Sequence, residues 1–232
     1  MCGRYSIAIE PAALEERFGV TLSRDIVPRY NAAPSQPLPV ILNSDPRHVV
    51  FAAWGIRPVW MSRVAKKDGL INVRFETLRD KATFRADLEG RRCLVPADGF
   101  YEWKTEAGKK KIPYRITRRD GKPFGFAGIW QEDVSGASPR FAIITTAADA
   151  FMQPIHSRMP VILDSKYEKA WVGGSSSDAI DLLRLLKMPY GPSLRAYEVS
   201  REVNRAAVDS PELIRPVGEG EDDAPLFKAA KM

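Results

Sequence analysis

The sequence predicts a single α+β domain in which antiparallel β-sheets form a barrel-like core with flanking helices. The middle of the chain holds a series of short apolar or aromatic runs, separated by turn-like segments such as 106–109 and 119–122. Strands at this spacing are typical of an antiparallel sheet or a partly closed barrel. Helix-like segments lie on both sides of the series, and no linker divides the body of the chain. These observations favour one domain.

The elements that precede the series are a helix, a loop, a strand and a second helix. A short helix is expected from Pro11, because proline suits the first helical turn, and Gly19 can end it. The proline-rich segment 28–39 is predicted to be an irregular loop. Residues 48–54 form a strand-like run, and residues 75–89 have a helical pattern.

The series itself and the elements after it complete the expected fold. The predicted strands are 93–95, 100–104, 112–117, 124–130 and 141–145. Two helices are expected over 165–172, with Ser165 as its cap, and over 177–187, before a last strand at 194–199. We expect residues 2–217 to form the domain and the acidic segment 218–232 to be a disordered tail.

Composition excludes several classes of protein. Of the 232 residues 44% are hydrophobic and 28% are charged, as in a folded soluble protein. The sequence has no run of about 18 apolar residues, so no membrane span is expected, and its first residues do not resemble a secretory signal. Two cysteines and two histidines are too few and too scattered for a zinc site or a disulfide framework. We expect a cytoplasmic monomer without metal or cofactor.

The charge balance favours an anionic partner. The chain has 35 basic and 29 acidic residues, a net charge of +6. Residues 217–232 contain four acids and two lysines, which leaves a body of about +8. Nucleic acid is the first candidate partner, although a basic protein can simply be soluble. A basic run crosses one predicted hairpin and could follow phosphates, or form a solvated turn; it consists of Lys104, Lys109, Lys110, Lys111, Arg115, Arg118 and Arg119.

Cys2 is the most informative position of the chain. Initiator methionine is generally removed when the second residue is small, so the mature protein would begin with this cysteine. It would then carry an α-amine with a pKa of about 7.7–8.0 beside a thiol with a pKa of about 8.5, both partly nucleophilic near neutral pH. Such a 1,2-aminothiol reacts with an aldehyde through an imine and closes a thiazolidine ring. The alternative is an incidental cysteine in a frayed terminus.

Several polar residues could assist this chemistry. Glu102 lies among aromatic residues, where its pKa should rise towards useful acid–base values, unless it faces water. His156 lies in a proline-flanked irregular segment and is either functional or a hydrogen-bonded structural residue. Asn72 could hold a sugar or backbone group, and Arg74 would share its strand face. His48 is expected on the surface.

Tryptophan residues could stack on the bases of single-stranded nucleic acid. Trp54, Trp60 and Trp103 each lie near glycine, proline or charged residues. Exposed aromatics beside arginines suit base stacking combined with phosphate contact, whereas the usual role of tryptophan is core packing. Cys93, on a predicted strand, is expected to be an ordinary buried residue.

Together these residues resemble the SRAP family, the SOS response-associated peptidase proteins that process abasic sites. The ordered motifs that carry the resemblance are MCGRY at 1–5, RYNAAP at 29–34, WGIRP at 54–58, INVRFET at 71–77, CLVPADGFYEW at 93–103, ITTAA at 144–148, HSRMP at 156–160 and PELI at 211–214. The set covers nearly the whole chain except the acidic tail.

The resemblance implies a role for each candidate residue. Cys2 would form a thiazolidine with the ring-opened aldehyde of an abasic deoxyribose. Asn72 would position the cysteine and the sugar, Glu102 would be the catalytic glutamate, and His156 would assist ring opening and proton transfer. The implied DNA-binding residues are Arg4, Arg74, Arg158 and Trp60. Since Met61 replaces the second aromatic that often follows Trp60 in the family, the stacking role of Trp60 departs from the family pattern.

The implied partner is single-stranded DNA that contains abasic sites, with nucleoid association during DNA damage and without a membrane or metal. Family members are also described as peptidases, partly because some remove their own N-terminal residue, and slow reversal of the crosslink is expected. Two alternatives remain. Cys2 could attack a carbonyl, as in an N-terminal-nucleophile cysteine peptidase or amidohydrolase. The protein could also be a DNA-binding module in which Cys2 is incidental.

Overall fold

Two β-sheets dominate the computed structural model, which describes residues 2–22, 26–58, 61, 68–78, 80, 82–106, 110–133, 138–174 and 194–218. The smaller sheet has the strand order β14-β9-β8-β1-β3. Its strands are β1 (Tyr5–Ile7), β3 (Arg29–Ala32), β8 (Gly99–Thr105), β9 (Lys111–Arg118) and β14 (Leu194–Glu198). All of its strand pairs are antiparallel, as the short alternating runs predict.

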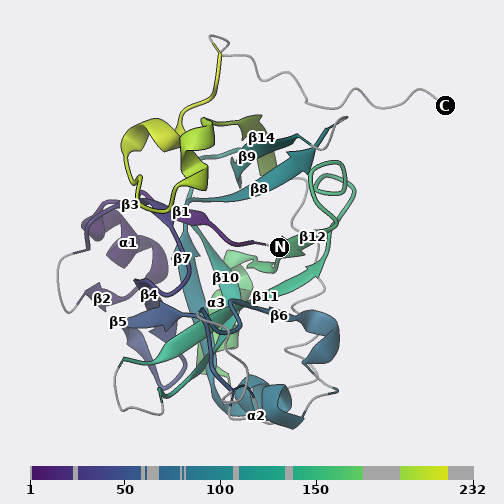
Figure 1. Cartoon of the computed structure of the whole chain (residues 1–232). Helices are drawn as coiled ribbons and strands as arrows, with labels where there is room; N and C mark the ends of the chain where they lie inside the picture. The colour runs from purple at the N-terminus through teal and green to yellow at the C-terminus, as the bar shows by residue number, and fades with distance from the viewer. Residues whose placement is uncertain are drawn as a thin grey trace.

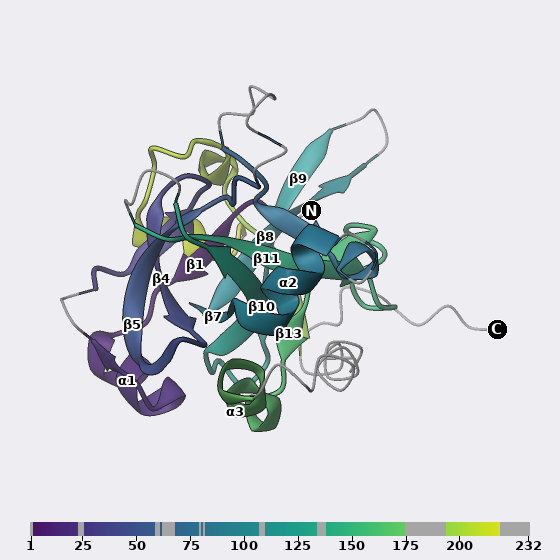
Figure 2. The same cartoon turned by 90° about the horizontal axis from the view of Figure 1, so that it is seen from below.

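The larger sheet closes into a ring. Its strands are β2 (Thr21–Leu22), β4 (Pro37–Leu42), β5 (Asp45–Trp54), β6 (Asn72–Arg74), β7 (Arg92–Ala97), β10 (Phe124–Gln131), β11 (Arg140–Ala147), β12 (Arg158–Pro160) and β13 (Ile162–Leu163). The path β11-β10-β7-β4-β5 is antiparallel, and a parallel pairing of β5 with β11 returns it to its start. The ring confirms the predicted barrel-like core, and its parallel closure, visible in Figures 1 and 2, is a feature that the sequence pattern does not reveal.

In the described part of the chain, three helices flank the sheets (Figure 2). Helix α1 (Pro11–Phe18) ends at Gly19, whose φ of 65° is the left-handed conformation that favours glycine, so the predicted boundaries are confirmed. The others are α2 (Ala82–Gly90) and α3 (Ser165–Gly173). Among the described residues, no helix is both long and apolar enough to span a membrane.

Three local predictions need correction, and two others lie outside the described residues. Segment 28–39 is not a loop, because it contributes β3 and the start of β4. The predicted helix over 75–89 divides into the 3₁₀ turn η2 (Phe75–Thr77) and helix α2. Asp164, rather than Ser165, caps α3 by accepting a hydrogen bond from the Lys166 amide at 3.2 Å. The predicted helix over 177–187 and residues 219–232 of the predicted tail lie outside the described residues.

Aromatic packing fills the space between the sheets. The Trp54 and Phe141 rings stack with centroids 6.1 Å apart, and Tyr5 meets Trp54 edge-on at 5.1 Å. Burying each such side chain stabilises the fold by about 1.5–3 kcal/mol. The Trp54 indole donates a hydrogen bond to the carbonyl of Ile71 at 2.9 Å. This tryptophan is therefore a core residue and cannot stack on a base.

The C-terminal segment is fastened to the N-terminal strands. It contains the 3₁₀ turns η5 (Arg201–Asn204) and η6 (Pro211–Ile214). The buried Asn31 amide donates to the Val203, Arg205 and Val208 carbonyls, at 3.3, 3.1 and 2.8 Å. In Figure 1 this yellow-green segment lies against β3 and β1. It thus braces the strand that carries the start of the chain.

Candidate active site

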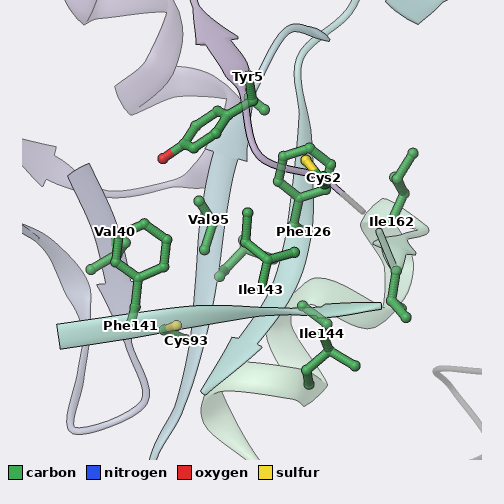
Figure 3. Close-up of a cluster of buried hydrophobic side chains, with 14 of the residues drawn as sticks. Cys2, Tyr5, Val40, Cys93, Val95, Phe126, Phe141, Ile143, Ile144 and Ile162 are labelled. Atoms are coloured by element: carbon green, nitrogen blue, oxygen red, sulfur yellow. The ribbon is translucent and has the colours of Figure 1, made fainter. Parts of the chain in front are cut away.

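Strand β1 brings Cys2 between the two sheets, beside β8 and β6. Register places Tyr5 of β1 opposite Phe100 of β8, and the Tyr101 amide donates to the Arg4 carbonyl at 3.0 Å. Figure 3 shows Cys2 within the cluster of buried hydrophobic side chains. The predicted nucleophile is therefore not in a frayed terminus but in the core of the fold.

The Cys2 thiol is held in its neutral form. Burial raises its pKa well above the usual value, and the negative charge of Glu102 acts in the same direction. The thiol donates a weak hydrogen bond to the Arg4 carbonyl, with sulfur and oxygen 3.7 Å apart. The sequence predicts a partly ionised thiol for a chain that begins with Cys2, whereas desolvation disfavours the thiolate in the folded chain that retains Met1. For the sulfur to act as a nucleophile here, a base would have to remove its proton.

Asn72 joins β6 to the nucleophile. Its side-chain amide donates a hydrogen bond to the Cys2 carbonyl at 2.8 Å. Its side-chain oxygen Oδ1 is buried and accepts no hydrogen bond from any residue that the structure describes. Since a buried acceptor without a donor is costly, this oxygen is suited to receive a hydrogen bond from an amine or a sugar hydroxyl. The structure thus brings Asn72 to Cys2, as the resemblance implies.

Glu102 is the acid–base candidate of the site. It lies on β8 with only 2% of its surface exposed. Burial raises the pKa of its carboxyl, while the positive charges of the amino terminus and of His156 act against the shift. A carboxyl in this environment can give up and regain a proton closer to neutral pH than an exposed one. The sequence prediction of a raised pKa for Glu102 is confirmed.

His156 faces the same space from the segment before β12. The Arg158 amide nitrogen lies 3.0 Å from its Nδ1, and the Arg158 carbonyl oxygen lies 3.1 Å from the same atom. Nδ1 therefore has a backbone partner whether or not it carries a proton, because it can accept from the amide or donate to the carbonyl.

A cleft of about 540 Å³ opens beside these two titratable side chains. Its lining consists of Glu102, Trp103, Thr105, Lys111, His156 and Asn204. The Trp103 indole donates to the Asn204 side chain at 2.7 Å, which ties η5 to β8. Among the lining residues that sequence reasoning missed, Asn204 and Thr105 carry no motif of their own. Their place becomes visible only when the C-terminal segment is folded against β8.

The predicted DNA-binding residues differ in their surroundings. Arg74 is exposed at the end of β6. Arg158 forms a bidentate ion pair with Glu76, at 2.6 and 2.9 Å, and also donates to the Thr145 carbonyl at 2.7 Å. Arg4 donates to the Val203 carbonyl at 2.8 Å. DNA contact by these residues remains a prediction, and Trp60 lies outside the described residues.

The basic run of the β8–β9 hairpin is not a continuous cationic surface. Arg115 is buried and pairs with Asp98 at 2.7 Å, while also donating to the Tyr197 and Ser6 hydroxyls. Arg118 pairs with Asp120 in the turn after β9. Lys111 lines the cleft. Arg119 is exposed, and Lys109 lies outside the described residues. Phosphate contact therefore remains a prediction for the exposed members of the run and not for Arg115.

We searched the described part of the chain for side chains that could together bind a metal ion. No group of three or more histidine, cysteine, aspartate or glutamate side chains is arranged to hold an ion within those ranges. The exposed His48 pairs with Asp45 at 2.9 Å, away from His156, as expected for a surface residue.

Comparison with known proteins identifies the family. Residues 1–206 match the family model described as SOS response associated peptidase (SRAP). The chain is 38% identical to the abasic site processing protein YoqW of Bacillus subtilis, over 92% of this chain and 99% of the relative. It is 30% identical to YedK of Escherichia coli, also an abasic site processing protein, over 94% and 100%. A crystal structure of a protein from Bacteroides thetaiotaomicron superposes with a TM-score of 0.81 and 26% identity, over 93% and 99% of the two chains. The chain belongs to the SOS response associated peptidase (SRAP) family.

Proposed function

We propose that this protein processes abasic sites in single-stranded DNA by forming a covalent thiazolidine through Cys2, after removal of Met1. The observation that carries the proposal is the placement of Glu102 and Asn72 around a buried Cys2: one provides a carboxyl whose pKa burial raises, the other holds the Cys2 carbonyl at 2.8 Å. The names of the curated relatives provide the substrate, an abasic site.

The proposed reaction begins with the sugar. His156 and Glu102 move protons between the hemiacetal hydroxyl and the ring oxygen, which opens the abasic deoxyribose to its aldehyde. The Cys2 amine adds to the aldehyde carbon, and water leaves with a proton from Glu102 to give an iminium. The sulfur then adds to the same carbon while the Glu102 carboxylate accepts the thiol proton. One water is released, and carbon gains one bond to nitrogen and one to sulfur.

The buried thiol gives this order a physical reason. Because burial keeps the thiol protonated, the amine is the better first nucleophile, and the thiol waits for a base. Glu102 becomes that base only after it has released its proton to the departing water. Fixing amine, thiol and carboxyl in one geometry lowers the barrier by several kcal/mol. Ring closure also removes the imine, which could otherwise promote β-elimination and strand breakage.

The experiment is an intact-mass measurement of the purified protein before and after mixing with abasic single-stranded DNA. We expect a starting mass that lacks Met1, and an adduct equal to the sum of protein and DNA less one water. Borohydride should leave the adduct mass unchanged, because a thiazolidine has no C=N bond to reduce. A variant with an extension before Cys2 that is not trimmed provides the control and should form no adduct. Absence of an adduct together with turnover of peptide amides would instead favour the N-terminal-nucleophile peptidase.

A further inference from the structure

Glu76 lies at the edge of the site and has no part in the reaction described above. It belongs to η2, directly after β6. Strand β6 pairs with β11 through Thr145 and Arg74, and β12 pairs with β11 through Ala147 and Arg158. The Glu76 carboxylate thus reaches the Arg158 guanidinium across β11. Its two oxygens lie 2.6 and 2.9 Å from the two terminal nitrogens.

The geometry of this pair is that of an arginine on a phosphate. A planar guanidinium donates two parallel hydrogen bonds to two oxygens of a carboxylate or of a phosphate with nearly the same spacing. The hydrogen bond from Arg158 lowers the pKa of Glu76, and the charge of Arg74 acts in the same direction. The ionised Glu76 carboxylate therefore pairs with Arg158 and is also affected by the charge of Arg74, and the resemblance implies a DNA-binding role for both arginines.

Exposure makes the pair exchangeable. The Glu76 side chain is 50% exposed, whereas the Arg158 side chain is 15% exposed and is also fixed by its hydrogen bond to the Thr145 carbonyl at 2.7 Å. Water solvates the exposed Glu76 carboxylate, so the pair contributes less to stability than an ion pair in which both partners are buried. Loss of the carboxylate from this position would leave Arg158 held by the Thr145 carbonyl.

We propose that Glu76 stands in for a DNA phosphate: it occupies the Arg158 fork in the free protein and is displaced when the backbone of single-stranded DNA binds. The inference rests on the proposed function, since it needs DNA at this edge. Glu76 would set the affinity for DNA without a lesion. Glu76 keeps Arg158 oriented for a phosphate, but each phosphate of an approaching DNA strand must compete with the Glu76 carboxylate for the Arg158 guanidinium.

The test is the affinity of Glu76→Gln for a lesion-free single-stranded oligonucleotide, measured over a series of salt concentrations. Removing the competing charge should tighten binding by about two- to fivefold at moderate salt. The salt slope should change by less than the roughly 0.7 that one phosphate contact contributes on a single strand, because Arg158 holds the phosphate in both complexes. Asp120→Asn is the matched control, because Asp120 is an exposed acid paired with Arg118 in the turn after β9.

A double-mutant comparison separates exchange from simple repulsion. In an Arg158→Ala background, Glu76→Gln should change the affinity no more than Asp120→Asn does. Equal gains for Glu76→Gln and Asp120→Asn in the wild-type background would overturn the proposal, as would a gain that persists without Arg158. Weaker binding by Glu76→Gln would also overturn it, and would assign Glu76 to orienting Arg158 only.

Failure of this inference is distinguishable from failure of the proposed function. If the wild-type protein forms the thiazolidine adduct and Glu76→Gln behaves like Asp120→Asn, only the role of Glu76 is wrong. If the wild-type protein neither binds single-stranded DNA nor forms an adduct, both proposals are wrong. Thermal unfolding of Glu76→Gln at the same salt concentrations establishes that the variant is folded when its affinity is measured.

Discussion

Cys2 and Cys93 are both fully buried, and burial raises the pKa of both thiols. Their surroundings differ in kind. Cys93 lies on β7 between β4 and β10, opposite Leu42 and Gly128, and burial is the one cause of its pKa shift. At Cys2, in addition, the Asn72 side-chain amide donates to the backbone carbonyl, the Arg4 carbonyl accepts from the thiol, and the charge of Glu102 raises the thiol pKa further.

The comparison teaches that burial of a thiol does not by itself indicate chemistry. Close packing explains Cys93: a Cβ added at Gly128 would lie 2.7 Å from its sulfur, so the pair fills the space between two strands. Apolar packing does not explain the polar groups around Cys2, since burying a charged carboxyl costs free energy unless the carboxyl is paired and hydrogen-bonded. A nucleophile is thus identified by the proton acceptors in its surroundings.

The largest expected effect comes from replacing each cysteine by serine. Cys2→Ser keeps the amine but removes the sulfur, so the stable adduct with abasic DNA should disappear while borohydride still traps an imine. Cys93→Ser should form the stable adduct at the wild-type level, because its side chain has no contact with the site. Intact mass with and without borohydride distinguishes the two. A stable adduct from Cys2→Ser would show that the sulfur is not bonded to the sugar carbon.

Glu102→Gln removes the proton acceptor that Cys93 lacks. We expect adduct formation to slow by about 10²-fold or more, the usual contribution of a positioned acid–base group, with unchanged affinity for lesion-free DNA. Single-turnover rates and equilibrium binding measure the two quantities separately. Glu106→Gln, an exposed acid just after β8, is the matched control. Equal losses of rate and affinity would assign Glu102 a structural role.

Arg74→Ala tests an exposed residue on β6, the strand that carries Asn72 to Cys2. Cys93 has no corresponding candidate for DNA contact. Loss of one phosphate contact should weaken binding of single-stranded DNA several-fold and make the salt slope shallower by roughly 0.7. Arg47→Ala removes an exposed arginine from β5 and serves as the control for net charge. An unchanged salt slope for Arg74→Ala would exclude it from the phosphate contacts.

The smallest expected effect is a pH-dependent difference in stability between wild type and Glu102→Gln. Burial raises the pKa of Glu102 above its ordinary value of 4.5. The neutral acid is therefore favoured in the folded state, and the stability this contributes is present below pH 4.5 and lost as pH rises through the folded-state pKa. Thermal unfolding should show similar midpoints at pH 4 and a wild-type midpoint a few degrees lower at pH 8. A wild-type protein that gains on the variant as pH rises would contradict the raised pKa.

Local signals predicted the elements that depend on neighbours in sequence. Pro11 and Gly19 mark the ends of α1 because proline and glycine act on their own backbone. The proline-rich segment 28–39 contains strands instead of the predicted loop, for a reason that depends on the three-dimensional pairing of β4. Pro37 and Pro39 lie in the part of β4 that pairs with β5, while the pairs with β7 involve Ile41 and Leu42. On the side of β4 where no strand pairs with it, a proline removes no hydrogen bond from the sheet, although proline has no backbone N–H.

Residue type and motif name the candidate residues but not their contacts. Asn72 and His156 come from β6 and the segment before β12 in the larger sheet, whereas Glu102 comes from β8, which pairs with β1 in the smaller sheet. Only the two sheets together bring these segments near Cys2. Nothing in the local sequence distinguishes Arg115, which is buried against Asp98, from Arg74, which is exposed. Partners separated by tens of residues decide whether an arginine supports the fold or faces a ligand.

The brace between Arg4 and Val203 has a consequence for the order in which the molecule is made. These two residues are 199 positions apart, and their hydrogen bond of 2.8 Å helps to fix the strand that follows Cys2. Synthesis runs from the amino end, so Cys2 leaves the ribosome long before the carbonyl that secures its strand. Cys2 therefore acquires the surroundings described here only after residue 203 has been made.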